Sequence, residues 1–295
     1  MSSVPVIGHI GYSGLVGKSI LTNLLEHHKA GKVRLVVLYR EGSDLSQIPD
    51  DVEKRLVQLD DSGAEQNKKA VEGLEVLLST VGAAGLKAQT YLIDALEGSK
   101  ALKTFVHSDF GTNWSAKELE APGLAVIKVK EHVVEHAEKK GVPITNIRVG
   151  AFDVYVFKFQ AGGTDIKGNK QQIFRNSLKN PLRITSIPYL GYATAQLLLK
   201  PQQLVNQTIQ LYDFSPTGQD FVDALTKING SQAVITHYSE EQYQADLKAG
   251  PGQAIGAAIK AKWGDDNWGP DGVPDIEGWK SKSFEELAKE WAAQV

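Results

Sequence analysis

The stretch Gly11-Tyr12-Ser13-Gly14-Leu15-Val16-Gly17 decides the fold that this sequence predicts. It follows an apolar run at residues 4–10 and opens a segment in which apolar residues recur at helical spacing between residues 20 and 25. A turn whose backbone N–H groups approach a phosphate needs residues without a Cβ, and the positive end of the following helix adds attraction. The strand, turn and helix together therefore predict a site for a nucleotide phosphate.

A second nucleotide motif overlaps this turn. Gly17-Lys18-Ser19 reads like the end of a P-loop, Gly-x-x-x-x-Gly-Lys-Ser. The first glycine of that motif would fall at position 12, which Tyr12 occupies, so the P-loop interpretation fails by one residue. The Gly-x-x-Gly-x-x-Gly spacing is instead similar to that of extended and atypical short-chain dehydrogenases.

Short apolar, β-branched runs alternate with segments of helical period through the first half of the chain. Strands are expected at residues 4–10, 33–39, 55–59, 76–81, 104–107 and 144–149. Helices are expected at residues 15–28, 64–73, 85–99 and 123–140. This alternation predicts an α/β fold with a Rossmann-type, doubly wound parallel sheet.

After Gly150 the alternation loosens. A strand-like segment at 182–187, helices at 190–199, 218–229 and 239–248, a Gly/Pro/Trp-rich passage at 264–279 and a terminal helix after Ser283 are expected. We therefore expect a dinucleotide-binding domain at residues 1–152 and a smaller C-terminal α/β substrate lobe at residues 153–295, which returns in part to the sheet around residues 182–200.

The composition of the chain limits its possible partners, its cysteine chemistry and its cellular compartment. The formal net charge is −3, with 32 basic residues spread among 35 acidic ones, which disfavours nucleic acid as the main partner. The chain has no cysteine, so it holds no disulfide, thiolate metal site or cysteine nucleophile. No signal peptide and no apolar run of roughly 18 residues is apparent. A cytoplasmic protein with no membrane segment is expected.

Arg40 bears on the choice of dinucleotide. In this fold an acidic residue at the end of the second strand binds the ribose 2′-hydroxyl, whereas an arginine accommodates a 2′-phosphate. The run at residues 33–39 ends in Arg40, so NADP(H) is favoured over NAD. A solvated surface arginine is the alternative, and the neighbouring Glu41 weakens the assignment.

Lys130 is the candidate catalytic residue. No tyrosine has a lysine four residues on, so the Tyr-x-x-x-Lys dyad is absent. At about 100° per residue, Lys130 lies at the centre of the apolar stripe of its helix, whereas Lys128 faces water. The stripe comprises Val126, Ile127, Val133, Val134 and Ala137. A lysine held there could polarise or protonate a substrate; the alternative is a lysine that reaches past the end of the sheet to solvent.

The same helix contains His132-Val133-Val134-Glu135-His136, the H-x-x-E-H pattern of inverted zinc peptidases. Histidines four residues apart share a helix face, so the spacing alone permits a metal. By the same angles, however, His132, Glu135 and His136 point away from the apolar stripe toward solvent. We therefore expect no metal site here.

Five segments in one order resemble the isoflavone reductase-like and NmrA-like branch of the atypical short-chain dehydrogenases. They are residues 11–17, Val37-Leu38-Tyr39-Arg40-Glu41, Ser79-Thr80-Val81-Gly82, Ser108-Asp109-Phe110-Gly111, and Lys130 through Gly141-Val142-Pro143-Ile144-Thr145. The likeness covers about the first 155 residues well and the rest only in outline.

The resemblance implies roles for particular residues. In that family the glycine turn and the arginine after the second strand bind NADPH, and the T-V-G and S-E-F-G segments line the cofactor. The residues implied here are Gly11, Tyr12, Ser13, Gly14, Leu15, Val16, Gly17, Arg40, Thr80, Val81, Gly82, Ser108, Asp109, Phe110 and Lys130. The family's catalytic lysine lies eleven residues before its G-I-P-Y-T turn, and counting back from Gly141 gives Lys130.

Some positions depart from the family pattern. His107 replaces a proline, Asp109 replaces a glutamate and Ile144 replaces the tyrosine of the turn, so substrate recognition is expected to differ from that of the plant enzymes. The aromatic segment after the sixth strand, with Phe152, Tyr155 and Phe159, is a candidate substrate wall, although such a cluster is also typical of a core.

The leading expectation is an NADPH-dependent reductase that delivers hydride to a small aromatic or conjugated organic substrate, with Lys130 as general acid or orienting cation. The first alternative is an NmrA-like, NADP-binding redox-sensing regulator without catalysis, which would have a regulatory protein as its partner. A non-redox tailoring enzyme that keeps the nucleotide fold is a third. A homodimer is left open.

Overall fold

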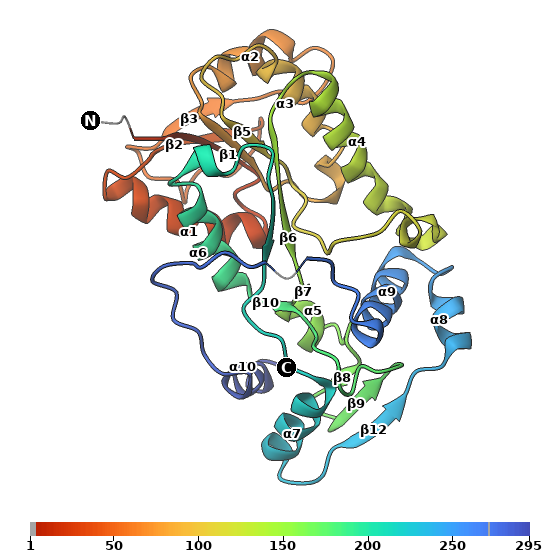
Figure 1. The fold of residues 1–295 in the computed structure, drawn as a ribbon. Coiled ribbons are helices and arrows are strands. Elements are labelled where there is room, and N and C mark those ends of the chain that lie inside the picture. Colours follow the sequence, from red (N-terminus) through yellow and green to blue (C-terminus); the bar gives the residue numbers. More distant parts are fainter. Residues whose placement is uncertain (1–3, 271) are drawn as a thin grey trace.

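The larger lobe of the molecule is built on a parallel sheet of seven strands in the order β11-β6-β5-β4-β1-β2-β3. The computed structural model describes residues 4–270 and 272–295 (Figure 1). The strands are β1 (Val6–Ile10), β2 (Arg34–Tyr39), β3 (Glu53–Leu56), β4 (Val76–Ser79), β5 (Thr104–Val106), β6 (Ile144–Val149) and β11 (Thr208–Leu211). This order confirms the Rossmann-type doubly wound fold.

Helices cover both faces of this sheet. One face carries α1 (Leu15–Lys29) and α6 (Ile187–Leu197), and the other carries α2 (Ala64–Val71), α3 (Gln89–Leu96) and α4 (Ala125–Lys139), as Figure 1 shows. Alternate side chains of β2 divide between the two cores: Leu35 and Val37 pack with α1, whereas Val36 and Leu38 pack with the other helices. A strand buried on both faces needs a continuous apolar run, which is why these strands are readable in the sequence.

The chain returns to the sheet after an excursion into the smaller lobe. Helix α6 packs so closely on α1 that a Cβ on Gly191 would lie 2.1 Å from Ser19 Oγ. The return also includes β11, which pairs in parallel with β6 from Thr208 to Leu211 and lies beyond the range 182–200 expected from the sequence.

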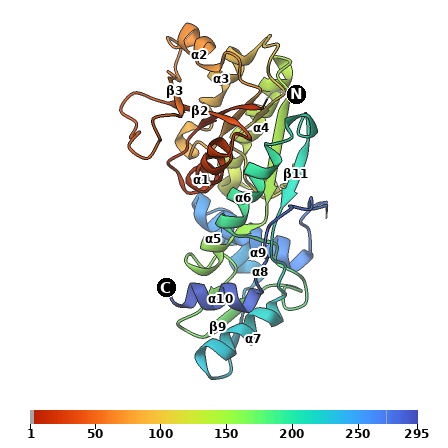
Figure 2. The same cartoon turned by 90° about the vertical axis from the view of Figure 1, so that its left-hand side faces the viewer.

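The smaller lobe lies at one end of the sheet (Figure 2). A three-stranded sheet, β8 (Thr164–Asp165), β9 (Lys170–Ile173) and β12 (Val234–His237), packs there with α5 (Asp153–Phe157), α7 (Gly218–Asn229), α8 (Glu240–Asp246), α9 (Pro251–Asp265) and α10 (Phe284–Ala292). Its core is aromatic, with Phe221, Trp263 and Trp268 almost fully buried. A short parallel pair, β7 (Ala151–Phe152) and β10 (Ile184–Thr185), joins the lobes.

Single turns of 3-10 helix complete the fold: η1 (Ala83–Gly85), η2 (Glu118–Glu120), η3 (Pro122–Leu124) and η4 (Pro201–Gln203). The chain also crosses back from the smaller lobe before α10. Ile276 is buried in the core beneath α1 and α6, and the Trp279 ring lies 5.4 Å from that of Tyr189. Within the described residues, no helix is long and apolar enough to cross a membrane.

Several expected elements differ from the structure. The third strand lies at Glu53–Leu56 instead of 55–59, and α3 covers only Gln89–Leu96 of the expected 85–99, because turns precede and follow it. The 182–187 segment contributes only the two residues of β10 before Ile187 begins α6. Helix α9 and strands β8, β9 and β12 were not expected, because glycines interrupt the apolar pattern of α9 and the strands are short.

Candidate functional site

The glycine turn lies between β1 and α1, beside the loop that follows β4. Gly11 has φ +84°, and a Cβ there would lie 2.5 Å from the carbonyl carbon of Thr80. A Cβ on Gly17 would lie 2.2 Å from the oxygen of Gly11. Both glycines are therefore required by close packing of the turn against its neighbours.

Gly14 plays a different part. It is exposed and is the N-cap of α1, with no side chain bonded to the first turn of that helix, and a Cβ there would meet nothing closer than 3.6 Å. The N–H groups of the first turn of α1 thus have no side-chain cap, and the space at Gly14 would admit an anionic group such as a pyrophosphate. Because the sheet order reverses between β1 and β4, this space lies where open α/β sheets bind their ligands.

The other residues of the turn are divided between surface and core. Ser13 and Leu15 are exposed and Val16 is half-buried. Tyr12 is buried instead, and its hydroxyl donates to the carbonyl oxygen of Asp44 at 2.9 Å. The Tyr12 side chain therefore supports the loop after β2, and only its backbone remains available to a ligand at the turn.

Arg40 lies where the sequence analysis placed it, immediately after β2, and is exposed. Its backbone N–H donates to the Ser43 hydroxyl at 3.2 Å, which shapes the loop. No hydrogen bond or ion pair of the guanidinium with another described residue is found. The side chain is therefore available to an anion next to the glycine turn.

The loops after β4 and β5 are joined beside the turn. Thr80 Oγ1 donates to the Ile10 oxygen at 3.0 Å, and Ser108 Oγ donates to the Val81 oxygen at 2.8 Å. The Ser108 N–H donates to Gln89 Oε1 at 2.7 Å, so α3 also fixes the second loop. Gly82 is exposed and has nothing within 4 Å of a built Cβ. These bonds form a fixed wall that borders the same open space.

Asp109 is the centre of a charged group at the end of β5. Its buried carboxylate lies 3.3 Å from Lys130 Nζ through Oδ1 and 2.9 Å from Arg148 Nη1 through Oδ2. Lys130 also donates to the main-chain oxygen of Asp109. Asp109 thus holds the side chain of Lys130, a residue of α4, and about 20% of the Lys130 side chain remains exposed.

The surroundings let Lys130 reach the space between the lobes. A Cβ on Gly111 would lie 3.0 Å from Lys130 Nζ, so a larger residue there would crowd the ammonium group. Phe110, with φ +40°, turns the chain so that Gly111 can pair with Arg148 of β6. On the same helix Ile127 is buried, but Val126 is 38% exposed and so lies off the stripe to which the sequence analysis assigned it.

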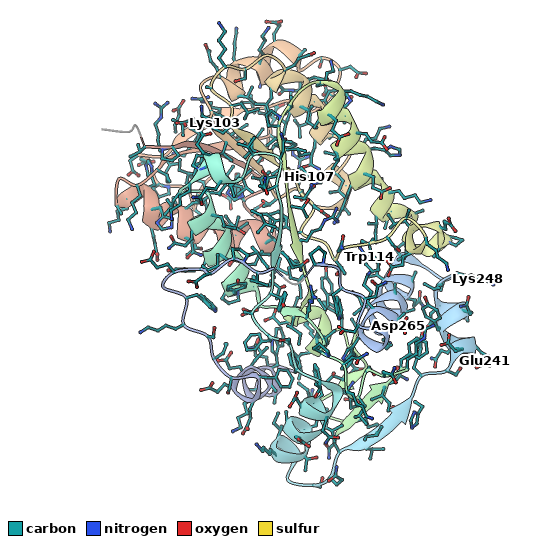
Figure 3. The ribbon with its side chains drawn as sticks, viewed as in Figure 1. Lys103, His107, Trp114, Glu241, Lys248 and Asp265 are labelled. Atoms are coloured by element: carbon teal, nitrogen blue, oxygen red, sulfur yellow. The ribbon has the colours of Figure 1, made fainter. Side chains whose placement is uncertain are left out.

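A cavity of about 800 Å³ opens beside Lys130, between the two lobes. One wall is formed by the ends of β5 and β6, through Phe110–Thr112 and Val149–Phe152, and another by one face of α9. Figure 3 shows Trp114, which also lines the cavity, near the junction of the lobes. This volume is in the range of sites for small organic ligands.

The aromatic segment after β6 lines this cavity. The rings of Phe152 and Tyr155 lie 5.9 Å apart, and those of Tyr155 and Phe159 lie 5.6 Å apart. Tyr155 is 48% and Phe159 62% exposed, so these two rings are not part of the core, whereas Phe152 is half-buried and packs against the core of the larger lobe. All three line the cavity. Such a row can stack against a planar ligand.

The opposite wall comes from α9, which the sequence analysis did not detect. Gly252 and Gly256 lie on the lining face, and a Cβ on either would meet nothing within 4 Å. Lys260 follows on the same face. Arg148 was also missed, although a basic residue within the apolar run of β6 was a readable signal.

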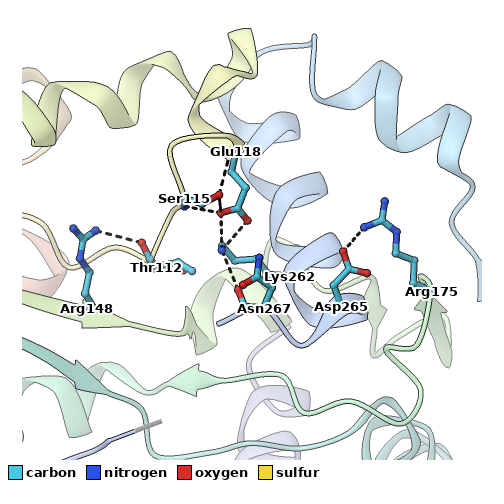
Figure 4. A network of polar contacts seen from close by, with 8 residues as sticks. All are labelled: Thr112, Ser115, Glu118, Arg148, Arg175, Lys262, Asp265 and Asn267. Carbon is cyan, nitrogen blue, oxygen red and sulfur yellow. Dashed lines mark hydrogen bonds and ion pairs between the residues drawn. The ribbon is translucent and has the colours of Figure 1, made fainter. Parts of the chain in front are cut away.

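A polar network fixes the segment between β5 and α4 against α9 (Figure 4). The buried Lys262 ammonium lies 2.7 Å from Glu118 Oε1 and donates to the Asn267 oxygen at 3.0 Å. Glu118 in turn accepts from the Ser115 N–H at 2.7 Å. The two walls of the cavity are therefore joined by a mostly buried ion pair.

Two buried histidines lie under the site. Burial lowers the pKa of His9 to about 3, and its Nε2 lies 2.9 Å from Thr80 Oγ1. Burial also lowers the pKa of His107, whose Nε2 lies 2.6 Å from Asn146 Oδ1. Both imidazoles are therefore neutral near pH 7 and support the loops by hydrogen bonds.

The histidines of the H-x-x-E-H pattern lie on the surface of α4. His132 is 3.5 Å from Glu135, and both side chains are exposed. His136 pairs with Asp94 of α3 at 2.9 Å. Among the residues that the structure describes, no group of three potential ligands capable of holding a metal is found.

Fold and site together define a Rossmann-type α/β protein with a glycine turn at the point where the strand order reverses and a cavity of about 800 Å³ between its lobes. The model of the NmrA-like family matches residues 4–291, so the chain belongs to that family.

Curated relatives are reductases and related plant proteins. The chain is 36% identical to leucoanthocyanidin reductase of Desmodium uncinatum over 74 residues, which are 25% of this chain and 19% of that protein. It is 28% identical to eugenol synthase 1 of Petunia hybrida over 177 residues, or 56% and 54% of the two chains. The matched stretches thus span less than two thirds of the length of these relatives.

Solved structures share the whole fold. AtPrR2 with NADP⁺ and (+)-pinoresinol superposes with a TM-score of 0.79 and 19% identity, over 99% of this chain and 100% of that one. The leucoanthocyanidin reductase–NADPH complex of Vitis vinifera has a TM-score of 0.75 and 18% identity, over 98% and 99%. At these identities the likeness establishes the fold.

Proposed function

We propose that this protein is an NADPH-dependent reductase that delivers hydride to a small aromatic or conjugated organic substrate held in the cavity between the lobes. The observation that carries the proposal is that Lys130, fixed by Asp109, lines the same cavity as the row of Phe152, Tyr155 and Phe159. A cationic donor and an aromatic wall thus face one cavity of the size of a small organic substrate.

NADP(H) is the proposed cofactor. The glycine turn with the free N–H groups of α1 would hold its pyrophosphate, and the exposed Arg40 would hold its 2′-phosphate. The walls at residues 80–82 and 108–110 would border the rest of the molecule. The bound cofactor supplies the hydride. The family relatives named above with NADP⁺ or NADPH bound support this assignment.

Lys130 would act as general acid or orienting cation. Its ammonium carries three donors, and Asp109 takes contacts from it through its main-chain oxygen and its carboxylate. A donor remains for an oxygen of the substrate on which negative charge develops as hydride arrives. Arg148 holds the far side of Asp109 and so acts as a positioning residue for Lys130.

The test is NADPH oxidation in the presence of a panel of quinones, enones and aryl ethers, with the Lys130→Ala variant alongside. We expect the variant to lose about 100-fold or more in kcat/KM, while NADPH binding persists. Lys128→Ala, an exposed lysine on the same helix, is the matched control and should retain wild-type activity. Undiminished activity of Lys130→Ala would contradict the assigned role.

The NmrA-like regulator gives a different outcome in the same assay. It would bind NADP(H) but turn over none of the substrates, and the Lys130 variant would behave as the wild type. Recovery of a regulatory protein that binds only one redox form of the cofactor complex would then favour the regulator over the reductase.

A further inference from the structure

Of the two lysines that line the cavity in the described part of the chain, Lys260 is the one that has no carboxylate within ion-pairing distance. Lys130 is paired with Asp109, and Lys262, two residues further along α9, is paired with Glu118 at 2.7 Å. For Lys260, by contrast, no described residue provides an ion pair or hydrogen bond. It lines the cavity from the smaller lobe.

The surroundings of Lys260 are aromatic and weakly charged. Its Nζ lies 4.6 Å from the centroid of the Tyr238 ring. Asp246 of α8 also lines the cavity, but its Oδ2 accepts a hydrogen bond from the Tyr238 hydroxyl at 2.5 Å. Asp246 therefore attracts the Lys260 ammonium only from beyond ion-pairing distance and forms no ion pair with it.

A half-buried ammonium without an anionic partner is energetically unfavourable, and a ligand anion lowers that cost. Burial lowers the pKa of Lys260, while Asp246 raises it. A carboxylate entering the cavity would find an ammonium group already partly stripped of water, which strengthens the attraction between them. Lys130, by contrast, already has a carboxylate against it, that of Asp109, which it shares with Arg148.

We propose that Lys260 is a specificity-determining residue that binds a carboxylate group of the substrate, so that the cavity selects aryl carboxylates over their neutral analogues. The aromatic row would contact the ring, Lys260 the carboxylate, and Lys130 the group that is reduced. Only the contact between Lys130 and the reduced group rests on the proposed function; the binding of a carboxylate by Lys260 does not.

Binding to the NADP⁺ complex tests the proposal. The probes are aryl carboxylates with one or two rings, such as trans-cinnamate, each compared with its primary amide by titration calorimetry. For at least one pair we expect the carboxylate to bind about tenfold more tightly, the effect of one charge-assisted hydrogen bond. Lys260→Met should abolish the preference without weakening binding of the amide, and Lys260→Arg should restore it.

Lys248→Met is the control, because Lys248 is an exposed lysine of the smaller lobe outside the cavity (Figure 3). It should keep the wild-type preference. If no pair shows a preference for the carboxylate in the wild type, or if Lys260→Met retains the preference, the proposal is wrong. If the wild type prefers the carboxylate but oxidises no NADPH with any substrate, Lys260 remains the carboxylate site and the reductase assignment is wrong. If the wild type oxidises NADPH but shows no preference for the carboxylate, the reductase assignment stands and the role of Lys260 is wrong.

Discussion

At the scale of single residues, contacts distant in the sequence determine what each charged side chain can do. Asp109 holds Lys130, 21 residues away, and Arg148, 39 residues away. The angular argument along the helix identifies Lys130 as a residue facing the interior, but neither partner can be read from periodicity. The pairing makes Lys130 a fixed cation instead of a mobile one.

Arg40 should decide the preference between dinucleotides. We expect Arg40→Ala to raise the Kd for NADPH about tenfold or more and to leave the Kd for NADH unchanged, because only NADPH carries the 2′-phosphate. Fluorescence titration of both cofactors would measure this. Lys18→Ala removes another exposed positive charge close to the turn and controls for general electrostatics. An unchanged affinity of Arg40→Ala for NADPH would refute the assignment.

His9 should make the fold sensitive to mild acid. Its pKa is about 3 in the folded chain and about 6.5 when unfolded, so the unfolded state binds the proton first and stability falls as the pH drops below 6.5. Between pH 7 and pH 5 this amounts to about 2 kcal/mol. In His9→Met the loss should be smaller by that amount, as measured by urea unfolding at both pH values.

Asp213 acts in the opposite direction and would mask part of this effect in the wild type. Burial raises its pKa to about 6, so its contribution to stability declines as the pH rises from its unfolded pKa toward 6. The comparison between His9→Met and the wild type cancels this contribution, because both carry Asp213. An identical pH dependence in the two proteins would show that His9 does not titrate as expected.

At the scale of elements, α9 shapes the cavity through the side chains that it lacks. Gly256 lies inside the helix with open space over its Cα, so Gly256→Ala should stabilise the fold by up to about 1 kcal/mol. Gly256→Leu should fill the cavity instead, and we expect it to weaken binding of two-ring ligands more than of one-ring ligands.

Thermal unfolding and the calorimetric titrations described for Lys260 would measure both effects. Gly252→Ala, on the same face of α9 but in its first turn, is measured alongside Gly256→Ala for comparison. A fall in the Tm of Gly256→Ala would mean that the space over Gly256 is filled in solution. If Gly256→Leu weakens the binding of one-ring and two-ring ligands by the same factor relative to the wild type, or of neither, the ligand lies elsewhere.

At the scale of the whole molecule, the two lobes should unfold together, because the chain passes between them several times. All five tryptophans follow residue 113, and Trp263, Trp268 and Trp291 lie in or against the core of the smaller lobe. In Trp279→Phe, which removes the ring packed on the larger lobe, fluorescence would report on the core of the smaller lobe and, through Trp114, on the junction of the lobes. We expect its urea midpoint to coincide with that of far-UV circular dichroism. Two separate midpoints would contradict this.

The sequence predicted the larger lobe well and the cavity only in part. Strands such as β2 and β4 are largely apolar because both faces are buried, so their positions follow from composition. The cavity wall on α9 was missed because Gly252 and Gly256, which open the cavity, also remove the helical signal. The aromatic segment was recognised, but its exposure depends on the opposite lobe, which local patterns do not describe.

The route of the chain has a consequence for protein engineering. The larger lobe is not contiguous, since α6 and β11 belong to it although they follow the first excursion into the smaller lobe. A chimera that exchanges everything after Gly150 between two relatives would replace an edge strand and a packed helix of the recipient. Transferring one relative's ligand preference to another therefore requires two separate cassettes, one before α6 and one after β11, with the recipient's own α6 and β11 kept between them.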